Sequence, residues 1–315
     1  VLVTNPASSH GVVLHRIEDE HRARLDSGPV VWHGTGAVER VLTNFTGLPG
    51  ATARCRYGVD SLSGDLLISQ TCTSPASGVW GVQWSIANIP LEYNIVVPGF
   101  SGVKLTRSSG GGLTTQSIDY PMSWEAQLVV VEGEGHGFYV WSDDPEARFK
   151  RLTVLRTTQG WQLGFISINH APFDGLRQCD SVSWRLNTYE GDWRAPARRY
   201  REWLAGAFAL TSIEQQQPAW VRDIRCCVIM GTDVALLEGL HQRLAPSQSL
   251  LYVYDWRASG YDRGYPTYDN PVPRLAEFVE RAHALGYRVM LHVNYFGCDP
   301  LHPLYPQFEP YQVRS

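Results

Sequence analysis

The sequence predicts an α+β multidomain protein: an antiparallel β-sandwich followed by a unit with a parallel sheet. Two observations predict this class. Up to about residue 190, short apolar runs alternate with clusters of Gly, Pro, Ser and Asn, which is typical of antiparallel strands. From about residue 221, strand and helix patterns alternate, which is typical of a parallel sheet. We therefore expect a β-sandwich over 1–190, a helix and linker over 191–220, and a unit with a parallel sheet over 221–315.

The clearest strand pair of the first part is "AQLVVVEGEGHGFYVWSDD", in which Gly133, Gly135 and Gly137 join two apolar runs. Glycines between two such runs favour a hairpin turn. A phosphate-binding loop would lead into a helix, whereas this segment leads into the strand-like "FYVW". The segment therefore indicates a hairpin rather than a nucleotide site.

A change of period occurs at "GDWRAPARRYREWLAGAF", which predicts a helix. Asp192 can cap its first turn, where Pro196 is also tolerated. The polar segment "TSIEQQQPAW" then predicts a linker. Beyond it we expect strands and helices in alternation, with Gly286 in the left-handed conformation that often ends a helix. The expected strands are 224–230, 249–256 and 287–294, and the expected helices are 234–244 and 273–285.

Composition excludes several classes of function. With 315 residues of which 43% are hydrophobic, the chain can bury a sizeable core, so disorder is excluded. A formal net charge of -4 gives no attraction to phosphate backbones, so we expect no nucleic-acid partner. We find no leader pattern and no apolar run of about 18 residues, so we expect no membrane partner. The compartment and the oligomeric state stay open.

The six cysteines show neither a CxxC motif nor a metal-ligand spacing. Cys55 and Cys72 lie in segments that we expect to be neighbouring strands. They could form a disulfide or remain buried thiols, and the sequence leaves both alternatives open.

Ligands of parallel α/β folds bind at the carboxyl ends of the strands, because the loops there converge. Three stretches hold these positions: "MGTD", "DWRASGYDRGYPTYDN" and "HVNYFGCDPLHPLYP". Carboxylates and amides can bind sugar hydroxyls, and aromatic rings can stack on the C–H faces of a sugar. The three loops therefore favour a carbohydrate ligand.

The order of these segments resembles a known superfamily. A β-sandwich, the "GDWRAPARRYREW" helix and then "YVYDW", "YPTYDNP" and "FVERAHALGYRVMLHVN" resemble the retaining α-glycoside hydrolases of families 31 and 36 and uncharacterised bacterial families near them. The resemblance covers nearly the whole chain and is most specific from Asp255 to Asn294. It implies that residues 221–315 are the start of a (β/α)8 barrel, a partial barrel truncated after about three strands. It also implies a glycosidase of α-galactosidase or α-glucosidase type with no cofactor.

The resemblance also implies roles for individual residues. Asp255 would hydrogen-bond substrate hydroxyls with Trp256 as a wall of the pocket, and His292, Asn294 and Tyr295 would line the neighbouring edge. The nucleophile and the acid/base would come from about the fourth and sixth strands. Residues 224–315 are too few for a full barrel of about 250 residues, so we expect about three strands and a fragment whose catalytic carboxylates lie beyond residue 315.

Other interpretations of these residues remain open. Asp255 and Asp299 could be the catalytic pair themselves, and Asp269 could cap the helix that begins near Pro271 instead of contacting substrate. His292 could be a satisfied interior histidine. The loop tyrosines could pack the loop rather than stack on a sugar: Tyr261, Tyr265 and Tyr268.

A metal site and a binding module are the two rival functions. His292, Asn294, Asp299 and His302 are close in sequence, but their spacing matches no metal-site pattern, so we expect no metal. The β-sandwich could instead be a non-catalytic carbohydrate-binding or scaffolding module. Its stacking platform would use four tryptophans, unless these fill the core: Trp80, Trp84, Trp124 and Trp141.

Overall fold

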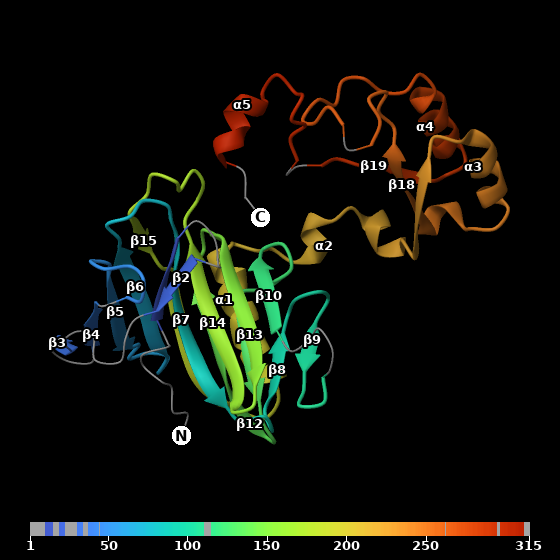
Figure 1. The fold of residues 1–315 in the computed structure, drawn as a ribbon. Helices are drawn as coiled ribbons and strands as arrows, with labels where there is room; N and C mark the ends of the chain where they lie inside the picture. Colours follow the sequence, from blue (N-terminus) through green and yellow to red (C-terminus); the bar gives the residue numbers. More distant parts are fainter. Residues whose placement is uncertain are drawn as a thin grey trace. The chain divides into compact units, whose positions relative to one another are not determined.

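The computed structural model of the chain describes residues 10–14, 19–22, 30–33, 37–43, 45–109, 115–261, 263–294 and 297–311. The chain divides into two compact units, unit 1 (Val1–Leu210 with Tyr311–Ser315) and unit 2 (Thr211–Pro310). Unit 1 is built on antiparallel sheets and unit 2 on a small parallel sheet with helices, which confirms the predicted fold class (Figure 1).

The first sheet of unit 1 has the strand order β10-β13-β14-β7-β1-β2, and every pairing in it is antiparallel. Its central strand β7 is buried on both faces over most of its length. The strands are β1 (His10–Leu14), β2 (Asp19–Arg22), β7 (Val79–Ile89), β10 (Thr115–Tyr120), β13 (Lys150–Thr157) and β14 (Gly160–Ile168).

The second sheet has the order β3-β4-β5-β6-β16-β12-β11-β8-β9, with β15 also paired to β6. Its β11 and β12 pair with Val130 opposite Tyr139, which confirms the predicted hairpin. The strands are β3 (Val30–His33), β4 (Ala37–Leu42), β5 (Thr52–Val59), β6 (Leu66–Thr73), β8 (Asn94–Val97), β9 (Val103–Leu105), β11 (Leu128–Glu132), β12 (His136–Asp143), β15 (Gln178–Asp180) and β16 (Ser183–Glu190).

The core of unit 1 lies between these two sheets. Trp84 of the first sheet stacks on Phe165 with ring centroids 4.5 Å apart and meets Trp184 of the second sheet edge to face. The four tryptophans of the suggested stacking platform are all buried, so this platform is wrong and the core-packing alternative is confirmed: Trp80, Trp84, Trp124 and Trp141.

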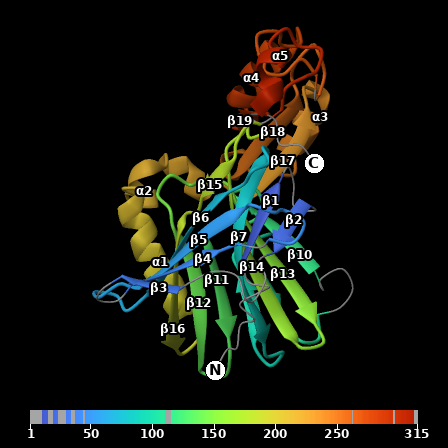
Figure 2. The same cartoon turned by 60° about the vertical axis from the view of Figure 1, so that its left-hand side comes forward.

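The helix α1 (Arg194–Ala207) covers the outer face of the second sheet (Figure 2). The Asp192 carboxylate accepts from the Arg194 backbone N–H at 2.9 Å from one residue before the N-cap position Trp193, which itself has no side-chain cap. Tyr200 of α1 packs edge to face against Trp141, in a cluster that also contains Leu128. The helix is therefore part of the β-rich unit, and β11 is buried on both faces.

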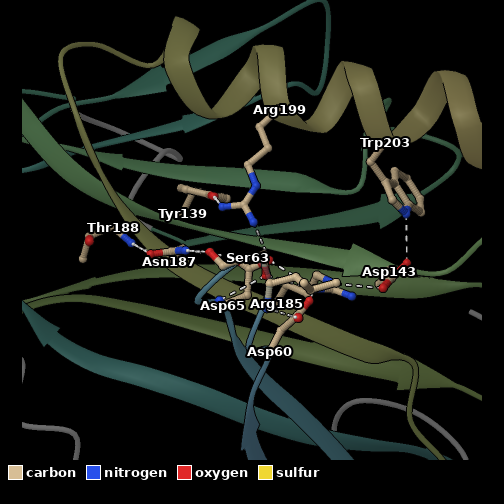
Figure 3. A network of polar contacts seen from close by, with 11 residues as sticks. Asp60, Ser63, Asp65, Tyr139, Asp143, Arg185, Asn187, Thr188, Arg199 and Trp203 are labelled. Carbon is tan, nitrogen blue, oxygen red and sulfur yellow. Dashed lines mark hydrogen bonds and ion pairs between the residues drawn. The ribbon is translucent and has the colours of Figure 1, made fainter.

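A network of charged groups lies between α1 and the sheet (Figure 3). Arg185 of β16 donates to Asp143 at 2.8 Å, to Asp60 at 2.7 Å and to Asp65 at 3.2 Å. Arg199 of α1 donates to the same Asp65 at 2.8 Å. Asp65 has no exposed surface, and its carboxylate is stabilised by these two guanidinium groups and by the Asn187 amide, which donates to it at 2.8 Å.

The cysteine pair can now be placed. Cys55 and Cys72 do lie on neighbouring strands, β5 and β6, but Cys55 is opposite Gln70 whereas Cys72 is opposite Ala53. Both side chains are thiols rather than halves of a disulfide. Burial raises the pKa of each thiol to about 12, which keeps them protonated and unreactive.

Unit 2 has one parallel sheet in the order β17-β18-β19 with two longer helices. Asp233 caps α3 by accepting from the N–H groups of Ala235 and Leu236, and Gly286 has φ of +90° directly after α4, as predicted. Its elements are α2 (Ile213–Gln216), η2 (Ala219–Asp223), β17 (Cys226–Gly231), α3 (Val234–His241), η3 (Pro246–Gln248), β18 (Ser249–Asp255), α4 (Leu275–Ala284), β19 (Arg288–Leu291), α5 (Tyr305–Phe308) and η4 (Glu309–Tyr311).

Among the residues that the structure describes, no helix has the length and apolar character needed to cross a membrane.

Replacing Arg185 by Met should lower the free energy of unfolding of unit 1 by about 3 to 5 kcal/mol, because it leaves the buried Asp65 carboxylate with one guanidinium partner fewer. Urea denaturation monitored by tryptophan fluorescence measures the change. Arg54→Met, which removes an exposed ion pair with Glu39, should cost less than about 1 kcal/mol. Equal effects of the two substitutions would contradict the role given to the network.

The acid stability of unit 1 should depend on Asp60. The Arg185 guanidinium, and then the Leu62 backbone N–H, hold the pKa of the Asp60 carboxyl well below its ordinary value. Below about pH 4 the unfolded chain therefore binds a proton that the folded chain does not, so stability present at neutral pH is lost as the pH falls. Urea midpoints between pH 6 and pH 2 should fall less steeply for Asp60→Asn than for the wild type. Glu92→Gln, at an exposed position, should leave the slope unchanged.

Candidate functional site

The two faces of the strand β18 have different surroundings. Leu251 and Val253 are fully buried against α3 and α4, where they contact the side chains of Leu237 and Phe278. Tyr252 and Tyr254 alternate with them and lie on the other face of the sheet. The face that carries the tyrosines is partly exposed, since Ile229 is 69% exposed and Met290 is 42% exposed.

Four aromatic side chains form a connected group on this face, which we call the open-face group: Tyr252, Tyr254, Tyr261 and His292. The His292 ring meets Tyr252 edge to face at 5.7 Å and Tyr261 at 5.2 Å, and Tyr261 meets Tyr254 at 6.2 Å. The Tyr252 hydroxyl is hydrogen-bonded to Nδ1 of His292. The group thus joins the end of β18, its loop and the end of β19.

The two ring nitrogens of His292 differ in their hydrogen bonding. Its Nε2 is buried and has no hydrogen-bond partner in the part of the chain that the structure describes. A buried polar atom without a partner costs free energy, and a ligand could reach this one only if the neighbouring side chains moved. The alternative of a fully satisfied interior histidine is therefore wrong for this ring, although its backbone is firmly held by a bond from its N–H to the Val253 carbonyl at 2.8 Å.

Asp255 ends β18 beside the open-face group. It is half-buried and lies opposite Gly231 of β17. No described residue forms a hydrogen bond or an ion pair with its carboxylate. A half-buried carboxylate without a protein partner at the carboxyl end of a parallel strand is available to bind a ligand.

Trp256 is buried and does not line the pocket as the resemblance implies. It is only 6% exposed, belongs to the hydrophobic cluster under α3 and α4, and stacks on Tyr268 at 6.2 Å. Its indole N–H donates to the His292 carbonyl at 2.8 Å. Trp256 therefore holds the backbone of His292 in place from the buried side, and it does not form an exposed wall.

Asn294 lies at the start of the loop after β19. The side-chain oxygen of Asn294 accepts a hydrogen bond from the Gly297 N–H at 2.8 Å. The backbone carbonyl of Asn294 accepts a hydrogen bond from the Tyr268 hydroxyl. Asn294 thus shapes this loop. Tyr295 lies outside the described residues.

Asp269 does not cap a helix. The helix α4 begins at Leu275 after Arg274. Between Asp269 and this start, Pro271 pairs with Arg257, and Pro273 and Arg274 form a turn. The capping prediction for Asp269 is therefore wrong, because the two prolines at 271 and 273 delay the first helical turn.

Arg257 is a residue of the site that the sequence did not single out. It is only 3% exposed, and its guanidinium donates to the carbonyls of Arg263 at 2.7 Å, Gly260 at 3.0 Å and Thr267 at 3.3 Å. It also lies 4.0 Å from the centre of the Tyr265 ring. One side chain thus fixes the course of the loop that carries Tyr261. An Arg two residues after the acidic strand end Asp255 was the only sequence signal.

Asp299 connects the two loops. Its Oδ2 accepts from the Gly264 N–H at 2.6 Å and its Oδ1 from the Leu301 N–H at 2.9 Å. These two backbone N–H groups hold the pKa of the Asp299 carboxyl below its ordinary value. A carboxyl kept ionised in this way is suited to accept hydrogen bonds and unsuited to act as a general acid, which argues against the pairing of Asp255 with Asp299 as acid and nucleophile.

A cavity of about 350 Å³ lies between these two loops, and we call it the loop pocket. His302 closes one side of it through a 2.8 Å hydrogen bond between its Nε2 and the Thr267 hydroxyl. Within the described residues there is no group of three or more His, Cys, Asp or Glu that could hold a metal ion. The lining residues are Ser259, Gly264, Thr267, Asn270, Asp299, Leu301, His302 and Pro303.

Comparison with known proteins supports a glycosidase-like fold. A family model described as a domain of unknown function (DUF6259) matches residues 181–312. No curated protein matches the sequence at a significant level. The α-N-acetylgalactosaminidase NagBb from Bifidobacterium bifidum, in its GalNAc complex, is similar with a TM-score of 0.69 at 14% identity, over 91% of this chain and 54% of that one.

Two further structures show the extent of the similarity. The Gal-NHAc-DNJ complex of NagBb gives a TM-score of 0.68 at 13% identity, over 94% of this chain and 55% of that one. The GH36 α-galactosidase AgaB from Geobacillus stearothermophilus gives only 0.41 at 12% identity, over 98% and 46%. The chain spans about half the length of these structures. The resemblance to glycosidases is confirmed at the level of the fold, and membership of family 31 or 36 stays a prediction.

Replacing Arg257 by Lys should loosen the loop between Ala258 and Thr267, because a Lys ammonium lacks the planar fork that reaches three carbonyls. Amide hydrogen exchange in this segment should become at least about 10-fold faster. Arg263→Met, at an exposed position of the same loop, is the matched control and should leave exchange unchanged. Equal exchange in both variants would show that the loop is held by other contacts.

Proposed function

We propose that this chain provides a sugar-binding edge of a glycoside hydrolase, a retaining α-glycosidase of the α-galactosidase or α-glucosidase type. The observation that carries the proposal is the Asp255 carboxylate, which lies unpartnered by described residues at the end of β18 beside the open-face group. The similarity in fold to NagBb, a structure solved with GalNAc, supports the same class of ligand.

The geometry gives each group a task. Asp255 accepts hydrogen bonds from sugar hydroxyls, because an ionised carboxylate is an acceptor with several lone pairs. Tyr261, 52% exposed, offers a ring on which the C–H face of a sugar can stack. The His292 ring lines the same edge beside Tyr261, and Trp256 positions His292 through its carbonyl.

Asn294 and Tyr295 complete the proposed edge. Asn294 holds the loop after β19 through Gly297, so its contribution is to place that loop. Tyr295 is proposed from the resemblance alone.

Hydrolysis with retention needs two carboxyl groups about 5 to 5.5 Å apart, one as the nucleophile and one as the acid/base. Asp255 is proposed as a binding group, and Asp299 is occupied by two backbone N–H groups. We therefore propose that the nucleophile and the acid/base lie outside residues 1–315, on later strands of a barrel to which β17, β18 and β19 belong. No cofactor is required for this chemistry.

The second candidate, a carbohydrate-binding sandwich module, gains no support from unit 1. The four tryptophans that a stacking platform would need are buried in the core or under α1. The glycosidase proposal is therefore the one that the described side chains favour.

Replacing Asp255 by Ala should reduce kcat/KM on the preferred glycoside roughly 100-fold, because a charged hydrogen bond to a sugar hydroxyl contributes about 1.5 to 3 kcal/mol. Aryl α- and β-glycosides of galactose, glucose and N-acetylgalactosamine would be assayed with the natural polypeptide and with residues 1–315. Turnover is expected from α-glycosides and only from the longer chain.

Asp269→Ala is the matched control, since it removes an exposed carboxylate from the same loop. It should leave kcat/KM within about twofold of the wild type. Unchanged activity of Asp255→Ala, with unfolding midpoints equal to those of the wild type, would remove Asp255 from the site. Activity of residues 1–315 alone would show that the catalytic carboxylates lie within this chain.

A further inference from the structure

Two of the buried cysteines of unit 1 lie directly opposite each other on neighbouring strands. Cys179 of β15 is the register partner of Cys72 of β6, in an antiparallel pairing. Residues opposite each other in such a pair carry their side chains on the same face of the sheet. Both side chains are buried, in a hydrophobic cluster that also contains Val79 and Val82 of the first sheet. The two thiols are therefore neighbours in the core, although they are far apart in the sequence.

The backbone of this pair has the spacing that a disulfide needs. The Ser74 N–H donates to the Arg177 carbonyl at 2.9 Å, and the Ser181 N–H donates to the Gln70 carbonyl at 2.7 Å. These bonds lie two residues to either side of the two cysteines, so the cysteines form a hydrogen-bonded pair of the ladder, with Cα atoms about 5.5 Å apart. Disulfides join Cα atoms that are about 4.4 to 6.8 Å apart, most often about 5.5 to 6 Å.

The side chains need only a small movement to meet. Both are thiols in the structure, and Sγ of Cys179 donates to the Ser167 carbonyl at 3.5 Å, a weak bond that a disulfide would replace. The Cβ atoms of a hydrogen-bonded pair are about 5.5 Å apart, whereas a disulfide brings them to about 3.5 to 4.5 Å. The strand β15 has three residues and is paired with β6, so a shift of about 1 Å by this short segment closes the gap.

Cys55 is the third buried thiol of the cluster, but its position excludes it as the partner. It lies opposite Gln70, whereas Cys72 lies opposite Ala53, so Cys55 and Cys72 are diagonal neighbours. Diagonal neighbours are about 7 to 8 Å apart, which is beyond the reach of a disulfide without movement of the backbone. Sγ of Cys55 instead accepts from the Gln70 side-chain amide at 3.6 Å. The pairing of β6 with β15 therefore selects Cys179.

Oxidation of this pair has to precede its burial. Burial raises the pKa of both thiols, to about 12 for Cys72, and only a thiolate attacks a disulfide. While the chain is unfolded, the thiolate of one cysteine attacks oxidised glutathione, forms a mixed disulfide and releases one glutathione. The other cysteine then attacks the protein sulfur of the mixed disulfide and releases the second glutathione. The two protein thiols thus lose two electrons and two protons, which the oxidant takes up as two thiols.

We propose that Cys72 and Cys179 are oxidised to a disulfide when the chain folds in the presence of a small-molecule disulfide, and that this bond fixes β15 on β6. The inference concerns unit 1 and does not depend on the proposed glycosidase function. The bond closes a loop of roughly 100 residues, and a crosslink over a long loop removes much conformational entropy from the unfolded chain. In a reducing environment the same two residues stay buried thiols, so the stability of unit 1 depends on the redox conditions under which it folded.

The test synthesises the chain by cell-free translation, once with oxidised glutathione and once with dithiothreitol, and then blocks free thiols with iodoacetamide in denaturant. Trypsin places Cys72 in the peptide 57–104, Cys179 in 178–185 and Cys55 in 55–56. Mass spectrometry without reduction should find the first two peptides joined after synthesis with oxidised glutathione and separate after synthesis with dithiothreitol. Six alkylated cysteines under both conditions, or Cys72 joined to a different cysteine, would overturn the proposal.

Two matched variants test the effect on stability, Cys179→Ala and Cys55→Ala, each of which removes one buried thiol from the same cluster. The Tm of the oxidised wild type should lie about 5 °C or more above that of the reduced wild type. Cys179→Ala should abolish this difference, and Cys55→Ala should retain it. Equal Tm values of the oxidised and reduced wild type would overturn the fixing of β15. A difference that persists in Cys179→Ala would assign it to another cysteine and overturn the proposal as well.

Discussion

The site depends on the alternation of side chains along the single strand β18. Leu251 and Val253 must face α3 and α4, because these helices bury them completely. The opposite face then belongs to Tyr252 and Tyr254, which meet His292 and Tyr261. The parallel pairing with β17 and β19 places Gly231, Asp255 and His292 at one edge of the sheet, so residues distant in sequence share one site.

The loops above this edge are shaped by two charged side chains that bind backbone groups instead of each other. Arg257 gathers three carbonyls of one loop, and Asp299 gathers backbone N–H groups from both loops. The Arg257 cation binds backbone carbonyls, and the Asp299 anion binds backbone N–H groups. These backbone groups lie outside helices and sheets, so the two side chains supply the hydrogen bonds that regular secondary structure supplies elsewhere. Two loops without regular structure can therefore present a stable surface to a ligand.

In unit 1, too, charged side chains hold neighbouring segments of the chain together. Its sandwich buries aromatic rings between two sheets. On the outer face, below α1, the unexposed Asp65 carboxylate accepts hydrogen bonds from Arg185 and Arg199. Trp141, a suggested ligand platform, belongs under this helix. The packing of α1 thus covers the Trp141 ring, which contacts Tyr200 and Trp203 of this helix.

The sequence by itself determined the class of fold, the hairpin at residues 133–137, the alternation of strands and helices beyond residue 224, and the left-handed Gly286. These features result from local periodicity and from the conformational freedom of glycine. It also selected Asp255 and His292, because strand ends can be read from the pattern. Only the tertiary structure decided the role of Trp256. Strict alternation would place Trp256 with Tyr252 and Tyr254, but β18 carries an irregularity near Tyr254, where the register to β17 shifts. An extra residue of this kind reverses the face on which the next side chains lie, and it depends on pairing with another strand, which no local pattern reveals.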